Sequence, residues 1–112
     1  MLILHDPDAS VSGGWDHWVL FNLPRDARAL AENQPKTATL PNGATHGRNS
    51  WGNLGYGGPC PPAGLAHRYQ FRLIALDTVL TLSAGATKAV VLAETTGHVL
   101  GETLLTGLYA RQ

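Results

Sequence analysis

The chain has 112 residues, and its content of 44% hydrophobic and 14% charged residues is typical of one folded soluble domain rather than a disordered tail. Its eight basic and eight acidic residues cancel, and no basic run is present, so we expect no nucleic-acid partner. No apolar stretch is long enough for an integral membrane segment, and the lone Cys60 cannot form an internal disulfide, so we expect a cytoplasmic protein.

The start of the chain predicts two strands separated by a turn and a loop. Leu2–His5 is short, apolar and compatible with a strand. Asp6-Pro7-Asp8 ends this strand, because proline lacks an N–H and restricts the residue before it. Trp15–Trp18 then leads into a second strand, Val19–Leu23. Alternation places one set of side chains, His17, Val19, Phe21 and Leu23, on the face opposite Trp18, Leu20 and Asn22.

The middle of the chain predicts a helix, a long loop and then a stiff loop that feeds a strand. Pro24–Asn33 is rich in alanine and favours a helix that stops before Pro35. Thr37–Leu54 is loop-like, and loops of this length in compact domains are often functional. Gly55–Gly64 is too rich in glycine and proline for regular structure. His67–Asp77 alternates as a strand, with an inward face of His67, Tyr69, Phe71, Leu73 and Ala75.

The end of the chain predicts a second short helix and a last strand. Ala86–Thr96 favours the helix, and Gly97 is placed to end it as a left-handed cap. Glu102–Tyr109 is compatible with the strand. Strands therefore dominate, and the fold class that we expect is mostly β with two short helices.

Two predicted strand ends each deliver a histidine close to turn-forming residues. The candidate residues for chemistry are Asp6, Asp8, His17 and His67, joined by Tyr69. A histidine can donate one ring N–H to a carboxylate and turn the other nitrogen toward a ligand. The backbone N–H groups of Gly57 and Gly58 could face an anion without side-chain obstruction. This combination favours a small pocket at a strand end.

Three segments also carry a resemblance to a known family. GPCPPAGLAHRYQF followed by ALD resembles one signature of the phosphatidylethanolamine-binding protein family, in its bacterial and archaeal Raf-kinase-inhibitor-like branch. DPDAS followed by WDHWVLFNLP is similar to the other signature, and GHVLGETLLTGLYAR resembles the family's final strand. The three matches occur in the family's order over nearly the whole chain.

The resemblance implies a fold and a domain organisation. We expect residues 1–112 to form a single domain, an antiparallel β-sandwich with two short peripheral helices. Only Met1–His5 precede the first signature, so the usual N-terminal strands of the family are expected to be missing. A sheet without them would expose apolar strand edges, which promote association. We therefore expect a chain that is oligomeric, for example a homodimer, or marginally stable, or rearranged relative to the family.

The resemblance also implies a function and a set of ligand-binding residues. Family members hold small anions or phosphoryl groups in a pocket, which corresponds here to Asp6, Asp8, His17, Gly58, Pro59, His67 and Tyr69. We therefore expect a non-enzymatic binding protein without a cofactor, whose partner is a small anionic or phosphorylated ligand. One departure is Ser10, which stands where the family motif usually has proline.

Two alternatives remain open from the residues themselves. Asp6, Asp8, His17 and His67 could serve a hydrolase as general acid and base, or two histidines and one aspartate could bind a metal ion. Family analogy alone adds inhibition of a kinase or a protease, with a protein as partner. Cys60, between prolines, is expected to be a small buried side chain with little reactivity.

Overall fold

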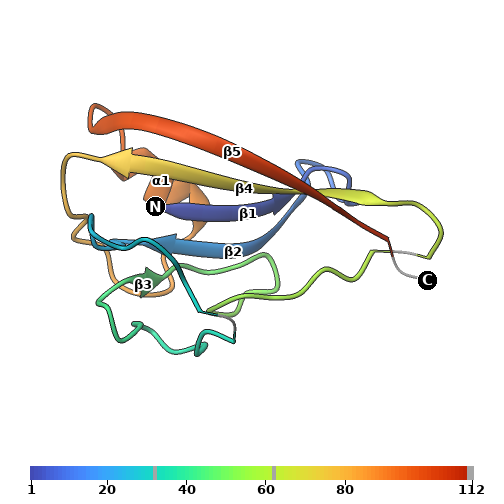
Figure 1. The fold of residues 1–112 in the computed structure, drawn as a ribbon, viewed down its shortest axis with the longest axis horizontal. Helices are drawn as coiled ribbons and strands as arrows, with labels where there is room; N and C mark the ends of the chain where they lie inside the picture. The colour runs from blue at the N-terminus through green and yellow to red at the C-terminus, as the bar shows by residue number, and fades with distance from the viewer. Residues whose placement is uncertain (32, 62, 111–112) are drawn as a thin grey trace.

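The computed structural model of the chain describes residues 1–31, 33–61 and 63–110. Glu32, Pro62 and Arg111, which fall within the expected helix, stiff loop and final segment, lie outside the described residues. The described strands form one antiparallel sheet of five strands in the order β3-β2-β1-β4-β5 (Figure 1). The elements in chain order are β1 (Leu2–Asp6), β2 (Trp15–Phe21), β3 (Thr45–His46), β4 (His67–Leu76), α1 (Lys88–Glu94) and β5 (Val99–Tyr109).

The expected mostly β, antiparallel fold is confirmed, but the described part of the chain has one helix rather than two. The helix predicted for Pro24–Asn33 is wrong: a single turn joins Ala27 N–H to the Pro24 carbonyl, and Asn33 has a left-handed φ of 54°. A short helix needs an apolar face packed on the core. Within this segment Arg25–Ala29 is exposed, and Leu30 packs against the core as part of a non-helical stretch.

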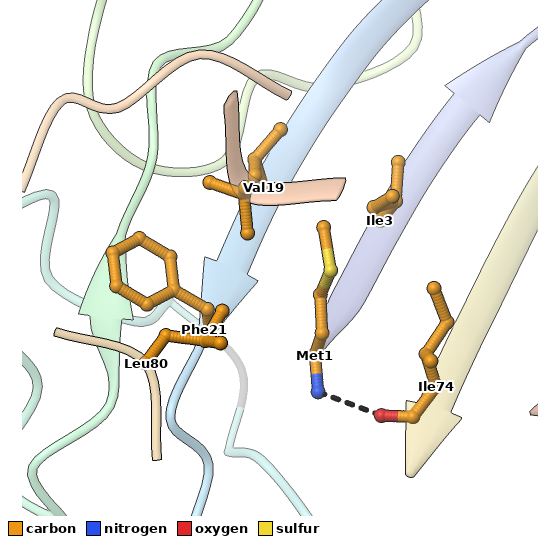
Figure 2. Close-up of a cluster of buried hydrophobic side chains, with 7 residues drawn as sticks. Met1, Ile3, Val19, Phe21, Ile74 and Leu80 are labelled. Atoms are coloured by element: carbon orange, nitrogen blue, oxygen red, sulfur yellow. Dashed lines mark hydrogen bonds between the residues drawn. The ribbon is translucent and has the colours of Figure 1, made fainter. Parts of the chain in front are cut away.

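Strand β1 lies inside the sheet, and its apolar residues are buried on both faces. On one face, the first cluster joins residues from β1, β2, β4, α1 and the loop after β4: Met1, Ile3, Val19, Phe21, Ile74, Leu80 and Val91. Figure 2 shows six of these side chains converging, with the Met1 amino group donating to the Ile74 carbonyl at 2.9 Å. On the other face, the second cluster contains Leu4, Trp18, Leu20, Leu40, Ala44 and Tyr69. Layers made by α1 and by loops, rather than by a second sheet, cover the described sheet (Figure 1).

The buried face of β4 changes along the strand. Tyr69 packs in the second cluster as expected, but Ile74 packs in the first cluster on the opposite face. Leu73, which alternation assigned to the inward face, is 46% exposed. Ile74 is buried because α1 and the loop after β4 cover the first-cluster face beside it.

Strand β5 is an edge strand that is exposed over its whole length. It pairs with β4 along one side, and every one of its residues is exposed, including Leu100, Leu105 and Leu108. An exposed edge with apolar side chains favours association, so the homodimer remains a prediction. In the described part of the chain, no helix is both long enough and apolar enough to cross a membrane.

Two adjacent valines of α1 provide a matched test of this packing. Val91 is fully buried in the first cluster, whereas Val90 is 46% exposed. We expect Val91→Ala to lower the free energy of unfolding by about 2–3 kcal/mol, because two methyl groups are lost and a cavity remains. Val90→Ala should change it by less than about 0.5 kcal/mol. Urea unfolding of both variants checks this, and equal losses would contradict the placement of α1.

Candidate functional site

The antiparallel order brings the end of β1 next to the starts of β2 and β4. Asp6 pairs with Trp15 in the β1–β2 ladder, and His5 pairs with Gln70 in the β1–β4 ladder. A cavity of about 210 Å³ lies at this edge of the sheet. The residues that border it are Asp6, Ala9, Ser10, Val11, Trp15, His17, Trp51, Cys60, Pro61, His67 and Tyr69.

Asp6 borders the cavity, and its side chain is almost fully buried. Its Oδ1 accepts the backbone N–H of Asp8 at 2.8 Å, within the turn that Pro7 imposes. Its Oδ2 lies 2.7 Å from Nδ1 of His67. A buried carboxylate is tolerated when it is paired in this way. Asp6 therefore ties the turn after β1 to the first residue of β4.

His17 reaches the cavity because of a β-bulge. Leu4 pairs with Trp18 and His5 pairs with Asp16, so His17 is the extra residue between two ladder pairs. Alternation had placed His17 on the face of Val19 and Phe21, and this prediction was wrong. Its ring instead lies 5.3 Å from the ring of Tyr69, a member of the second cluster on the other face. Bulges commonly re-aim a side chain in this way.

Two hydrogen bonds to Gly57 hold His17 in place. The Nδ1 atom of His17 lies 2.9 Å from the Gly57 carbonyl oxygen, and the Gly57 N–H donates to the His17 carbonyl. A Cβ at position 57 would lie 2.1 Å from the ring of Trp51, so only glycine fits under that ring. The Gly57 N–H, expected to face an anion, is therefore already engaged.

Tyr69 carries a hydroxyl group with no hydrogen-bond partner among the described residues. The side chain is 4% exposed, and its ring stacks near that of His67 at 6.4 Å. Burial, followed by the charge of Asp6, raises the pKa of Tyr69 to about 12. The phenol therefore stays a neutral O–H donor at ordinary pH.

Asp8 lies beside the cavity and pairs with Arg68. Its two carboxylate oxygens accept from Nε and Nη2 of Arg68 at 3.0 and 2.8 Å, and Oδ2 also accepts the Arg68 backbone N–H at 2.8 Å. These hydrogen bonds hold the pKa of Asp8 well below its usual range. Asp8 and Arg68 act as a second clamp between the turn and β4.

The structure thus brings together four of the seven residues that the sequence pointed to: Asp6, His17, His67 and Tyr69. Asp8, Gly58 and Pro59 do not border the cavity that the described residues outline. Cys60 does border it and is exposed, which corrects the expectation of a buried side chain. Trp15 and Trp51 were not predicted as site residues. The length of the loop that carries Trp51 was the one sequence signal for it.

A second hollow, of about 550 Å³, is also bordered by Trp51, and its side chains offer fewer ionisable groups. It is bordered by Lys36, Asn49, Trp51, Asn53, Leu54, Tyr56 and Gly57. The Asn49 amide is engaged there, because it donates to the Gly55 carbonyl and accepts from the Trp51 and Asn53 N–H groups. Within residues 1–31, 33–61 and 63–110, no group of three or more His, Cys, Asp or Glu residues could hold a metal ion.

Comparison with known proteins places these features in a family. The profile described as phosphatidylethanolamine-binding protein matches residues 1–110. A UPF0098 protein of Methanothermobacter thermautotrophicus is 57% identical over 98% of the chain, which spans 72% of that relative. UPF0098 proteins of Aquifex aeolicus and Pyrococcus horikoshii are 41% and 39% identical, and the chain spans 65% and 57% of their lengths.

Two crystal structures share the fold. The structure of Escherichia coli YbcL, described as a new member of the mammalian PEBP family, superimposes with a TM-score of 0.87 at 33% identity. A putative PEBP homologue from Chlamydia trachomatis, CT736, gives a TM-score of 0.87 at 38% identity. Each comparison covers 99% of this chain, and 70% and 71% of the two crystallised chains respectively.

The clamp between Asp8 and Arg68 predicts an unusual acid titration. We expect the Asp8 carboxyl to titrate well below the usual value of ~3.9, because Arg68 favours its charged form. The Asp8–Arg68 pair should contribute its full stabilisation at pH values above the ordinary aspartate pKa of ~3.9. This stabilisation should disappear as the pH falls through the lowered pKa of Asp8.

Arg68→Gln should return the Asp8 midpoint toward the ordinary value in a carboxyl NMR titration. Arg72→Gln is the matched control, because Arg72 lies on the same strand and pairs with Glu102 instead. An Asp8 midpoint that is unchanged in Arg68→Gln would show that the ion pair does not form in solution.

Proposed function

The chain belongs to the phosphatidylethanolamine-binding protein family, and we propose that it is a non-enzymatic binding protein for a small anion, specifically a phosphoryl group. The cavity at the ends of β1, β2 and β4 is the binding site in this proposal. His17, His67 and Tyr69 are the residues that contact the ligand. Asp6 and Asp8 position them.

The observation that carries the proposal is the unpartnered hydroxyl of Tyr69. A buried hydroxyl without a hydrogen bond costs about 1–3 kcal/mol, and buried polar groups usually have partners. Trp18 Nε1 and His46 Nε2 are also buried without partners in the described residues, but only Tyr69 belongs to a residue that borders the cavity. A ligand oxygen accepting from Tyr69 would remove this penalty.

The hydrogen bonds of the two histidines define what their other ring nitrogens can do. The Gly57 carbonyl oxygen can only accept a hydrogen bond, so Nδ1 of His17 carries a hydrogen. The Asp6 carboxylate also accepts, so Nδ1 of His67 carries a hydrogen as well. In each neutral ring, Nε2 is then an acceptor, which an anion would avoid. In the imidazolium form, Nε2 becomes a donor that carries positive charge. Anion binding therefore favours protonated histidines, and pairing of Asp6 with His67 leaves His17 as the source of net positive charge.

The size of the cavity limits the ligand to a small group. Pockets for drug-sized molecules measure roughly 300–1,000 Å³, whereas this cavity measures about 210 Å³. It suits inorganic phosphate or one phosphorylated head group, and it is too small for acyl chains. The exposed ring of Trp51, which contacts the His17 ring edge-on at 4.9 Å, would pack against whatever carries the phosphoryl group.

Replacing Tyr69 with phenylalanine separates binding from stability. Tyr69→Phe removes only the unpartnered hydroxyl, so the ligand-free protein should gain about 1 kcal/mol of unfolding free energy. The same variant should bind phosphate and phosphoethanolamine about tenfold more weakly, since it lacks one donor.

Urea unfolding and isothermal titration calorimetry measure the two effects. Tyr109→Phe is the matched control, because Tyr109 is exposed and does not border the cavity; it should change neither quantity. A Tyr69→Phe protein that is destabilised and binds with wild-type affinity would contradict the proposal. Hydrolysis of phosphoethanolamine during titration would instead indicate an enzyme.

Because a bound anion favours the protonated histidines, we expect anion affinity to depend on pH. Sulfate is the suitable probe, because its own charge is constant over the relevant range. Imidazole is ordinarily charged below pH ~6.5, so sulfate should bind well at pH ~6 and about tenfold more weakly at pH ~8.

His17→Gln should reduce sulfate binding at pH ~6 to the level seen at pH ~8. His98→Gln is the control, since His98 is exposed, pairs with Asp77 and lies away from the cavity. A flat pH profile in the wild-type protein would exclude the histidines as the groups that attract the anion.

A further inference from the structure

The described sheet has two edges of very different length. Strand β3, at one edge, has two residues, whereas β5, at the other edge, has 11. At about 3.4 Å per residue, the edge that β5 forms is about 37 Å long. Within the described residues β5 pairs with β4 alone, so no strand lies beside the backbone groups on its outer side (Figure 1). A strand with such an open side can pair with another chain.

The outer edge of β5 lacks most of the features that usually prevent such pairing. Natural edges are protected by lysine, proline, bulges or inward charges. The strand Val99–Tyr109 contains no lysine and no proline, and its one charged residue, Glu102, pairs with Arg72 at 3.1 Å. The bulge in its ladder lies near its first residues and leaves the rest regular. Leu104 and Leu105, in the regular part, are 55% and 69% exposed.

The amino-acid order along β5 is nearly symmetric about its central residue, Leu104. Residues at equal distances on either side of it form the pairs Thr103 and Leu105, Glu102 and Thr106, Gly101 and Gly107, Leu100 and Leu108, and Val99 and Tyr109. If two copies of the strand run antiparallel about a two-fold axis through Leu104, the members of each pair lie opposite one another. Leu104 then faces its own counterpart, glycine faces glycine, and the Glu102 carboxylate faces a threonine hydroxyl that can donate to it. The bulge at Leu100 affects only the two outermost pairs.

Other two-fold registers place unlike residues opposite one another. Paired residues share a face of the sheet, so the axis must pass through a residue. An axis through Thr103 puts Glu102 opposite Leu104 of the second copy. An axis through Leu105 puts Glu102 opposite Leu108. An axis through Glu102 itself puts two carboxylates opposite one another, which is destabilising, and axes farther from the middle shorten the ladder.

We propose that the outer edge of β5 is a contact surface between two copies of this chain, paired antiparallel about a two-fold axis at Leu104. The two sheets then continue into one another, and the outer backbone groups of each β5 form ladder hydrogen bonds with the other. The near-symmetry of the strand identifies a second copy as the occupant, because a strand from an unrelated protein requires no symmetry. None of the described residues of β5 borders the cavity, so this proposal does not depend on the proposed function.

Sedimentation equilibrium of the wild-type chain and of Leu104→Glu tests the surface. The wild-type chain should form a dimer, and Leu104→Glu should raise the dissociation constant of the dimer at least about a hundredfold, because two carboxylates come to lie opposite one another. The monomer should keep its fold by circular dichroism, since Leu104 is exposed and lies opposite Arg72 of β4. Leu65→Glu is the matched control, because Leu65 is 80% exposed in the loop before β4, and this variant should remain a dimer.

A disulfide cross-link tests the register. In a Cys60→Ser background, Leu104→Cys should form a disulfide-linked dimer on mild oxidation, because residues opposite one another in an antiparallel ladder have Cα atoms about 4.5–5.5 Å apart. Leu108→Cys is the matched control, since Leu108 is exposed on the same strand. In the proposed register the two Leu108 positions lie about 27 Å apart along the ladder, so this variant should not cross-link.

Three results would overturn the proposal. A wild-type chain that stays monomeric would leave the edge to a strand of another protein. A Leu104→Glu chain that dimerises as the wild-type chain does would place the interface elsewhere. A cross-link through Leu108→Cys, or none through Leu104→Cys, would contradict the two-fold axis at Leu104.

Discussion

The buried carboxylate of Asp6 is the group on which the geometry of the cavity depends. One oxygen accepts from the turn that follows β1, and the other pairs with His67 at the start of β4. A buried carboxylate that loses its partner is left as an uncompensated charge, which costs several kcal/mol. The two contacts therefore hold the turn, the strand and the imidazole ring together, and the Asp8–Arg68 clamp repeats the connection closer to solvent.

Most polar side chains around the cavity form hydrogen bonds within the protein, but one does not. Asp6, His67 and His17 each use a side-chain atom within the protein, so their orientations are set before any ligand arrives. Tyr69 is different, because its buried hydroxyl has no partner in the described residues. Such preorganisation lowers the cost of binding, and the unsatisfied hydroxyl identifies where a small acceptor would be held most strongly.

The two faces of the sheet are covered by different elements, and this difference decides which side chains are buried and where the cavity opens. Helix α1 and the loop after β4 seal the first-cluster face, where Ile74 and Val91 are buried. The opposite face is covered by loops, and it opens at the strand ends into the cavity. Leu73, which local alternation alone placed inward, is exposed.

The sequence by itself determined four of the five described strands, the turn and much of the site, whereas β3 lies in the segment Thr37–Leu54 that was expected to be a loop. Proline between two aspartates ends β1, alternation marks β4, and antiparallel pairing then brings Asp6 beside His67. Only the tertiary structure decided the rest, because bulges and long-range contacts leave no local pattern. The bulge that turns His17 toward Tyr69 depends on the register against β1. The segment Pro24–Asn33 was predicted to be a helix from its composition, but its packing against the core, and not its helix propensity, decided its conformation.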